Sequence, residues 1–195
     1  MEFVPLGIDG AYEVRNVVHA DDRGEFAEWF RFDHIETHTG YRFPVRQANV
    51  SRSARGVVRG IHFAEVPPGQ AKLVTCMSGS IRDVVVDIRV DSPTFGTWKA
   101  VDLSAASRDA VLLPVGVGHA FVALEEGTTV CYLVSDVYTP DKEHGIHPLD
   151  PQLAIDFGIP ESELLLSPKD QQAPTLSEAQ ALGLLPHVDA KEPVK

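Results

Sequence analysis

Residues 110–135 read AVLLPVGVGHAFVALEEGTTVCYLVS and decide the fold class. This stretch holds apolar runs that are too short for stable helices, and each run is bounded by Gly, Pro or acidic residues. Such runs are typical of β-strands, because β-branched and aromatic side chains pack well on a pleated surface. The stretch predicts three strands: Ala110–Leu113, Ala120–Leu124 and Thr129–Ser135. Turns are predicted between them at Pro114 and Gly127.

The same pattern extends upstream as far as Val45. Five further runs are separated by turn residues at Gly79, Pro93 and Gly96: Val45–Ser51, Val57–Phe63, Lys72–Met77, Ile81–Val90 and Trp98–Leu103. Eight short strands without an internal repeat predict a mainly β domain, a jelly-roll sandwich or barrel.

Helical signals are few and lie outside this region. Asp33, with Glu36 three residues later, predicts a short capped helix that ends near Gly40. Thr175 and Glu178 predict a second helix that stops at Gly183. The proline-rich segment 159–174 is expected to run over the surface and wrap back onto the β domain, and a loose tail is expected from about residue 187.

Composition limits the function classes. The 195 residues, 44% of them hydrophobic, suit a single domain spanning 1–195. A net charge of −11 argues against a broad nucleic-acid surface, and no run approaches the roughly 20 apolar residues that cross a bilayer. Cys76 and Cys131 lack the spacing of a metal knuckle, so we expect both to be buried free thiols. We also expect a cytoplasmic protein.

The segment Arg55–Phe63 brings a cation and an imidazole onto one strand. Strict alternation would place Arg59 and His62 on opposite faces, so a shared site requires a bulge at Gly60 or the end of the strand. A histidine in such a strand is more often a satisfied structural residue than a catalytic one, so this segment alone does not predict a base.

A polar face on the neighbouring run is more telling. Gln47, Asn49 and Ser51 alternate along one strand and so share a face. Because polar groups are costly in a dry core, this face predicts a wet or ligand-filled cavity.

Residues 114–119, PVGVGH, match the Pro-x-Gly-x-x-His motif of cupin barrels. Metal-binding cupins also carry a His-x-His pair and a later Glu, whereas the corresponding strand here offers only His62. Since a stable metal centre normally takes at least three protein ligands, the resemblance implies a cupin-like jelly-roll β-barrel without a metal or another cofactor.

Further motifs resemble one family in order and spacing, the dTDP-4-dehydrorhamnose 3,5-epimerases: Asp22-Arg23-Gly24, Val58–Phe63, Gln70-Ala71-Lys72, Asp83–Arg89, Ser92–Gly96 and Asp150-Pro151. The resemblance implies a substrate that is a dTDP-4-keto-6-deoxy sugar, in dTDP-rhamnose or antibiotic-sugar biosynthesis. It also implies that the C4 ketone acidifies C3 and C5, which are inverted through an enolate.

The resemblance also implies roles for particular residues. His62 would be the base, held by Asp170, with Lys72 stabilising the enolate and Tyr132 acting as the acid. The substrate would be bound by further residues of the same subunit: Gln47, Asn49, Arg59, His119, Tyr138, Glu143 and Lys169. Arg23, Phe26 and Glu28 would reach into the partner's site of a homodimer that exchanges its N-terminal strands.

Several alternatives stay open. Ala120 stands where many family members have glycine, and related antibiotic enzymes sometimes invert only C3 or only C5. Another alternative is a metal-dependent cupin that uses His62 and His119 with His144, His147 or a carboxylate. The others are a non-catalytic sugar-binding barrel and a 3,4-ketoisomerase, although binding alone needs no acid and base on opposite faces.

Overall fold

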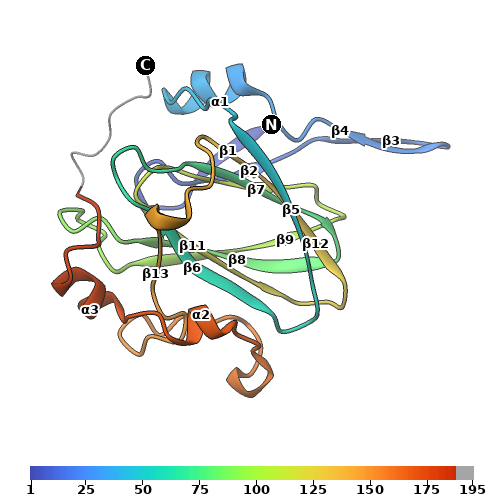
Figure 1. Ribbon diagram of the computed structural model, residues 1–195. Coiled ribbons are helices and arrows are strands. Elements are labelled where there is room, and N and C mark those ends of the chain that lie inside the picture. Colours follow the sequence, from blue (N-terminus) through green and yellow to red (C-terminus); the bar gives the residue numbers. More distant parts are fainter. Residues whose placement is uncertain (188–195) are drawn as a thin grey trace.

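The computed structural model describes residues 1–187, in which two antiparallel sheets face each other (Figure 1). One sheet has six strands in the order β1-β2-β10-β7-β12-β5, the other has five in the order β13-β6-β11-β8-β9, and β3 and β4 form a separate hairpin. The strands are β1 (Glu2–Pro5), β2 (Tyr12–Arg15), β3 (Val18–Asp21), β4 (Gly24–Ala27), β5 (Gln47–Ser53), β6 (Val58–Ala64), β7 (Lys72–Ser78), β8 (Ser80–Asp87), β9 (Trp98–Ser104), β10 (Ala110–Leu113), β11 (Val117–Ala123), β12 (Thr128–Val134) and β13 (Glu143–Gly145). The predicted mainly β jelly roll is confirmed, with both sheets open at their edges.

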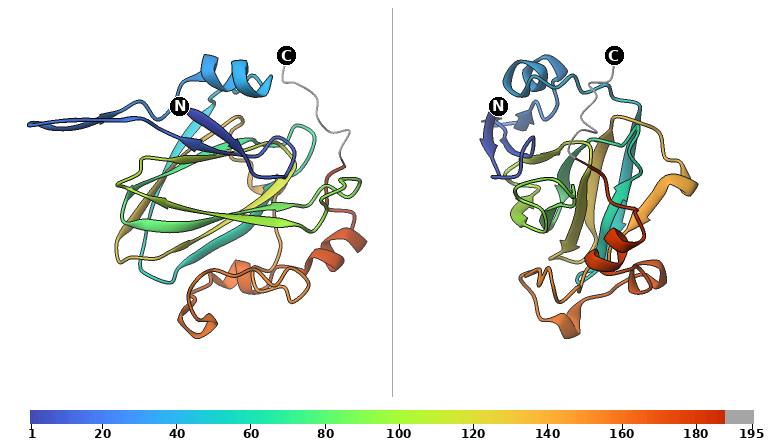
Figure 2. Two further views of the ribbon diagram at one scale, coloured as in Figure 1. Left: turned by 180° about the vertical axis from the view of Figure 1, so that it is seen from behind. Right: turned by 90° about the vertical axis from the view of Figure 1, so that its left-hand side faces the viewer.

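Apolar clusters lie between the sheets and on both outer faces. Between the sheets, Val74 packs with Val85 and Phe121. Helix α1 (Phe32–Thr39) covers the outer face of the six-stranded sheet, and the C-terminal segment covers the outer face of the five-stranded one (Figures 1 and 2). Because each sheet is covered on both faces, a strand such as β10 is apolar and buried along its whole length, which explains the continuous apolar runs in the sequence.

The eight predicted strands correspond to β5 through β12, with ends shifted by at most three residues. Strand β8 was expected to reach Val90 but ends at Asp87, whose carboxylate accepts hydrogen bonds from Arg89 and Ser92 and turns the chain. Strands β1 to β4 and β13 were not among the predicted runs. They are only three or four residues long and mostly half-exposed, so they lack a marked apolar pattern.

The helix predictions met different outcomes. Helix α1 ends at Gly40 as predicted, with Gly40 in a left-handed conformation. Asp33 does not cap the helix, because the cap is Arg31, two residues earlier. The capping box of Thr175 and Glu178 is present in α3 (Leu176–Ala181). The remaining helices are α2 (Pro168–Gln171), η1 (Pro140–Lys142) and η2 (Glu161–Glu163).

The β3–β4 hairpin projects from the body of the chain (Figures 1 and 2). No helix in the described part of the chain is long and apolar enough to cross a membrane. Cys76 is buried as expected, whereas Cys131 is only half-buried, and both are free. Apart from its first residue, the predicted loose tail lies outside the described residues.

Candidate active site

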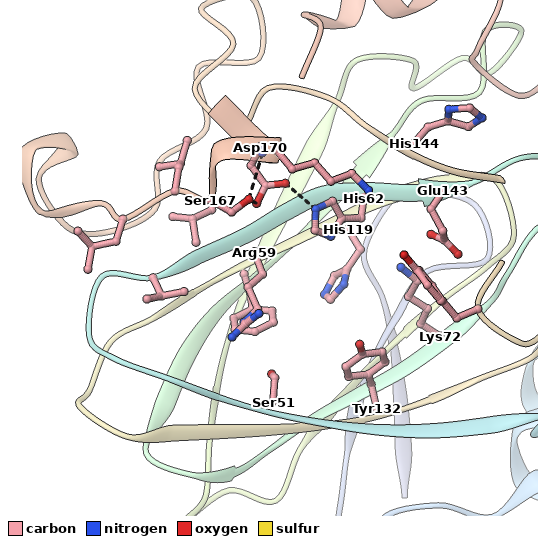
Figure 3. A pocket seen from close by; sticks show the side chains of 17 residues that line it. Ser51, Arg59, His62, Lys72, His119, Tyr132, Glu143, His144, Ser167 and Asp170 are labelled. Carbon is pink, nitrogen blue, oxygen red and sulfur yellow. Dashed lines mark hydrogen bonds and ion pairs between the residues drawn. The ribbon is translucent and has the colours of Figure 1, made fainter. Parts of the chain in front are cut away.

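A cavity of about 550 Å³ opens between the two sheets and collects residues from distant parts of the chain (Figure 3). Strands β6 and β11 supply one wall, β7 and β12 the facing wall, and the segment around α2 closes one side. The predicted site residues that line it are Arg59, His62, Lys72, His119, Tyr132, Tyr138, Glu143, Lys169 and Asp170.

A bulge brings Arg59 and His62 to the same cavity. In the β6–β11 ladder His62 lies opposite His119, while Arg59 lies opposite Phe121, so three steps along β6 match two along β11. Gly60 makes this possible: a Cβ there would meet the His119 carbonyl oxygen at 2.4 Å. Of the two arrangements that the sequence left open, a bulge at Gly60 and the end of the strand, the structure shows the bulge.

His62 is held by a carboxylate from the C-terminal segment. Its Nε2 donates to Asp170 Oδ1 at 2.7 Å, across 108 positions of sequence. Ser167 caps α2 and donates to the other carboxylate oxygen at 2.8 Å. Burial works to raise the pKa of Asp170, but the hydrogen bonds from His62 and Ser167 outweigh it and hold the pKa below its ordinary value. The pair therefore fixes the ring and leaves Nδ1 as the unbonded nitrogen.

The facing sheet contributes an amine and a phenol. Tyr132 of β12 lies opposite Val74 in the ladder with β7, the strand that begins with Lys72. Desolvation lowers the pKa of Lys72, against the opposing charges of Glu143 and Asp83. Desolvation also raises the pKa of Tyr132. The cavity thus holds a histidine–carboxylate pair on one wall and a protonated phenol on the other.

His119 has its own carboxylate. Its Nε2 lies 2.7 Å from Asp83 Oδ2, and Asp83 is completely buried in β8. Sequence reasoning did not assign Asp83 a role, although a carboxylate in an apolar strand is itself a signal that a polar partner lies nearby. Both His62 and His119, which line the cavity, are therefore paired with an aspartate.

Arg59 is an exposed residue of β6 whose side chain reaches β5. Its Nε donates to Ser53 Oγ at 3.1 Å, and its guanidinium also reaches the Arg52 carbonyl oxygen at 3.4 Å. These contacts leave some N–H groups of the Arg59 guanidinium available to an anionic ligand. Lys169 adds a second positive charge to the lining.

Gln47 and Asn49 lie beside the cavity rather than in its lining. Gln47 Nε2 donates to Asn49 Oδ1 at 2.8 Å, and Gln47 Oε1 accepts from the backbone N–H of Tyr138 at 2.9 Å. Ser51, two residues further on the same face of β5, does line the cavity. The predicted polar face is thus real, but only one of its three residues lines the cavity.

Arg23, Phe26 and Glu28 are not brought to the cavity of their own chain. Arg23 pairs with Asp21 at the tip of the hairpin, and 69% of the Phe26 surface is exposed. Glu28 lies 4.0 Å from Arg31.

Several lining residues were missed by sequence reasoning: Val57, Val58, Phe121, Leu165, Leu166 and Ser167. Alternation from His119 identifies Phe121, which is two residues further along β11. The residues before α2 carry no such signal, because their position depends on how the C-terminal segment folds back. Leu165 forms an isolated bridge with Val57 at that point.

The donor set of a metal cupin is not assembled in residues 1–187, where no group of three or more His, Cys, Asp or Glu side chains converges. His147 Nδ1 accepts from the Leu149 backbone N–H, and His144 lies 3.7 Å from Glu65. Independence of a metal or another cofactor stays a prediction.

Comparison with known proteins gives a consistent result. Residues 5–178 match the family model described as dTDP-4-dehydrorhamnose 3,5-epimerase. The chain is 52% identical over 186 residues to a dTDP-4-dehydrorhamnose 3-epimerase of Streptomyces niveus (95% of this chain, 89% of the relative). It is 53% identical over 184 residues to a dTDP-4-dehydrorhamnose 3,5-epimerase of Mycolicibacterium smegmatis (93% and 89%). A solved 4-keto-6-deoxy sugar epimerase from the novobiocin gene cluster of Streptomyces spheroides superposes with a TM-score of 0.94 at 50% identity (98% and 96%), which supports the predicted cupin-like fold.

Proposed function

Because the chain belongs to the dTDP-4-dehydrorhamnose 3,5-epimerase family, we propose that it inverts C3 and C5 of a dTDP-4-keto-6-deoxy sugar. Membership of the family makes the chain an epimerase, an isomerase of carbohydrates in deoxysugar biosynthesis. The observation that carries the proposal for this chain is that His62 and Tyr132 line one cavity from opposite sheets.

The reaction begins with proton removal. The C4 ketone acidifies the hydrogen on each neighbouring carbon, and His62 takes that proton at Nδ1, since Nε2 is engaged with Asp170. The electron pair moves onto the C4 oxygen, where the Lys72 ammonium stabilises the enolate. Tyr132 then returns its phenolic proton to the carbon from the opposite face, which inverts the centre. Proton exchange with solvent then restores the neutral imidazole and the phenol before the next inversion.

The nucleotide occupies the open side of the cavity. Arg59 and Lys169 bind the diphosphate, because a guanidinium and an ammonium are the usual partners of phosphate oxygens. Gln47, Asn49, Glu143 and His119 bind the remaining polar groups of the substrate. Tyr138, 56% exposed beside the mouth, stacks on one face of thymine.

The active enzyme is a homodimer in which each β3–β4 hairpin completes the partner's site. Three features support this arrangement: the hairpin projects from the body of its own chain (Figure 1), Phe26 is exposed on it, and β5, which contributes Ser51 to the cavity, is an edge strand of its sheet in the described residues. Arg23, Phe26 and Glu28 then reach the nucleotide of the neighbouring chain, and Phe26 covers the second face of thymine. In this proposal, residues 1–195 form one domain, and the two chains of the dimer exchange their hairpins.

Inversion of only C3 is the second candidate, because a relative that is 52% identical to this chain is named as a 3-epimerase. Relatives named as a 3-epimerase and as a 3,5-epimerase are 52% and 53% identical to this chain, so similarity does not separate the two. Both reactions use the same base and acid.

The test is proton NMR of the protein with dTDP-4-keto-6-deoxyglucose in deuterated water. The proposal expects loss of both the C3 and C5 signals, with inversion of both centres in the reduced product. Exchange at one centre alone identifies a monoepimerase, and the absence of exchange contradicts the proposed function. Because a diphosphate sugar does not cross a bilayer unaided, we also propose a cytoplasmic location.

A further inference from the structure

Asp83 is a charged group that neither the fold nor the proposed mechanism accounts for. It lies in β8 between Ile81 and Val85, which both belong to the apolar cluster between the sheets, and none of its surface is exposed. One carboxylate oxygen, Oδ2, meets His119 Nε2 at 2.7 Å. The other, Oδ1, has no hydrogen-bond partner among the described residues. A buried carboxylate with a single partner is costly, so its retention suggests a role beyond packing.

His119 stands beside the proposed base. It lies directly opposite His62 in the ladder between β6 and β11, and its ring lines the cavity (Figure 3). An ionised carboxylate can only accept hydrogen bonds, so the Nε2 that meets Asp83 carries the hydrogen. In the neutral ring Nδ1 is then a bare acceptor, and it is the only ring nitrogen left for a ligand.

This tautomer decides what His119 can bind. A bare Nδ1 repels a phosphate oxygen, which is itself an acceptor, but it accepts well from a hydroxyl. A hexose with a ketone at C4 and a methyl at C6 keeps ring hydroxyls at C2 and C3. Because His119 lies directly opposite the proposed base His62, it faces the sugar rather than the diphosphate.

We propose that Asp83 is a positioning residue that holds His119 with its hydrogen on Nε2, so that Nδ1 accepts a hydrogen bond from a sugar hydroxyl beside a reacting carbon. The inference rests on the proposed epimerase function and narrows the ligand of His119 from the polar groups of the substrate in general to a hydroxyl of the sugar.

The first test needs no variant. Nitrogen-15 NMR of the histidine side chains in the substrate-free protein reads the tautomer of His119, identified by loss of its signals in His119→Ala. The proposal expects hydrogen on Nε2 and a bare Nδ1 at neutral pH. A ring with hydrogen on Nδ1, in either the neutral or the charged form, overturns it. This result is independent of turnover, so it stands apart from any failure of the proposed function.

The second test uses Asp83→Asn, which keeps the shape of the side chain but can donate to Nε2 and reverse the tautomer. Loss of the carboxylate that orients a functional histidine typically lowers activity by roughly tenfold to hundredfold. We expect the C3 exchange rate of Asp83→Asn to fall by this factor, while the affinity for dTDP changes by less than about twofold. The double variant Asp83→Asn/His119→Ala should match His119→Ala alone. Unchanged exchange in Asp83→Asn, weaker dTDP binding in His119→Ala, or a double variant much slower than His119→Ala would each contradict the proposal.

Discussion

His62 and Tyr132 are expected to fail in different ways when replaced. His62→Ala removes the group that takes the proton, so exchange at both carbons should fall by roughly 10²- to 10⁴-fold. Tyr132→Phe leaves the base intact and removes only the returning proton, so solvent deuterium should still enter while inversion is lost. Deuterium content and configuration of the reduced product measure the two steps separately. Undiminished inversion in either variant would contradict the assigned roles.

The alkaline limb of the pH profile should report Lys72 rather than Tyr132. Free tyrosine loses its proton before free lysine, at about 10.0 against 10.5, but the cavity lowers the pKa of Lys72 and raises that of Tyr132. Since only the protonated amine stabilises the enolate, exchange should decline as pH rises through the lowered pKa of Lys72, while the phenol keeps its proton. In Lys72→Arg, whose guanidinium does not deprotonate, this limb should disappear. A limb that stays in place in Lys72→Arg would assign it to another group.

At the scale of single elements, the bulge of β6 depends on Gly60. An alanine at position 60 would have to adopt a φ of 129°, and its Cβ would clash with the backbone of β11. Gly24 has a similar φ of 134°, but a Cβ there would have no atom within 4 Å. The two substitutions share the conformational penalty and differ in the clash. Gly60→Ala should therefore lower the free energy of unfolding by about 1–3 kcal/mol more than Gly24→Ala, measured by urea denaturation. Equal losses would mean that β11 yields without cost.

The caps of α2 and α3 form a matched pair. Ser167 and Thr175 each accept from a backbone N–H at a helix start, but only Ser167 also reaches Asp170. Replacing either by alanine should cost about 1 kcal/mol of stability. Only Ser167→Ala should also slow exchange, because it removes the hydrogen bond that holds the Asp170 carboxylate in place against His62. The same hydrogen bond lowers the pKa of Asp170. Equal exchange rates in the two variants would limit Ser167 to a structural role.

The sequence predicted those elements whose signal is local. Each strand from β5 to β12 is an apolar run between turn residues, and alternation alone showed that a shared site for Arg59 and His62 needs either a bulge at Gly60 or the end of the strand. The cap of α1 was wrong because Asp33 sits inside the first turn, where an acidic residue also favours a helix start. The His119–Asp83 pair was missed because it joins β11 to β8, and strand pairing is not written in either strand by itself.

At the scale of the whole molecule, the site is a product of topology. His62 and Asp170 meet only because the C-terminal segment folds back over the five-stranded sheet, and Tyr132 faces them only because the two sheets stack. Family motifs identified these residues without giving their arrangement. The apolar wall that includes Leu165 and Leu166 had no motif at all, so it could be found only in the folded chain.

The exchanged hairpin makes a prediction about pairs of chains. One variant carries His62→Asn with an intact hairpin, and the other carries Arg23→Ala and Phe26→Ala with an intact His62. Each homodimer should be nearly inactive. Unfolding and refolding an equal mixture produces mixed dimers in which the hairpin of the first chain completes the site of the second.

Random pairing makes half of the dimers mixed, each with one complete site, so the mixture should regain about a quarter of the normal activity. The control is His62→Asn refolded with a chain carrying both sets of substitutions, in which no complete site can form and activity should stay absent. If Arg23 and Phe26 act on the cavity of their own chain, the first mixture gives only the average of its parts. That result would contradict the exchanged dimer while leaving the roles of His62 and Tyr132 untouched.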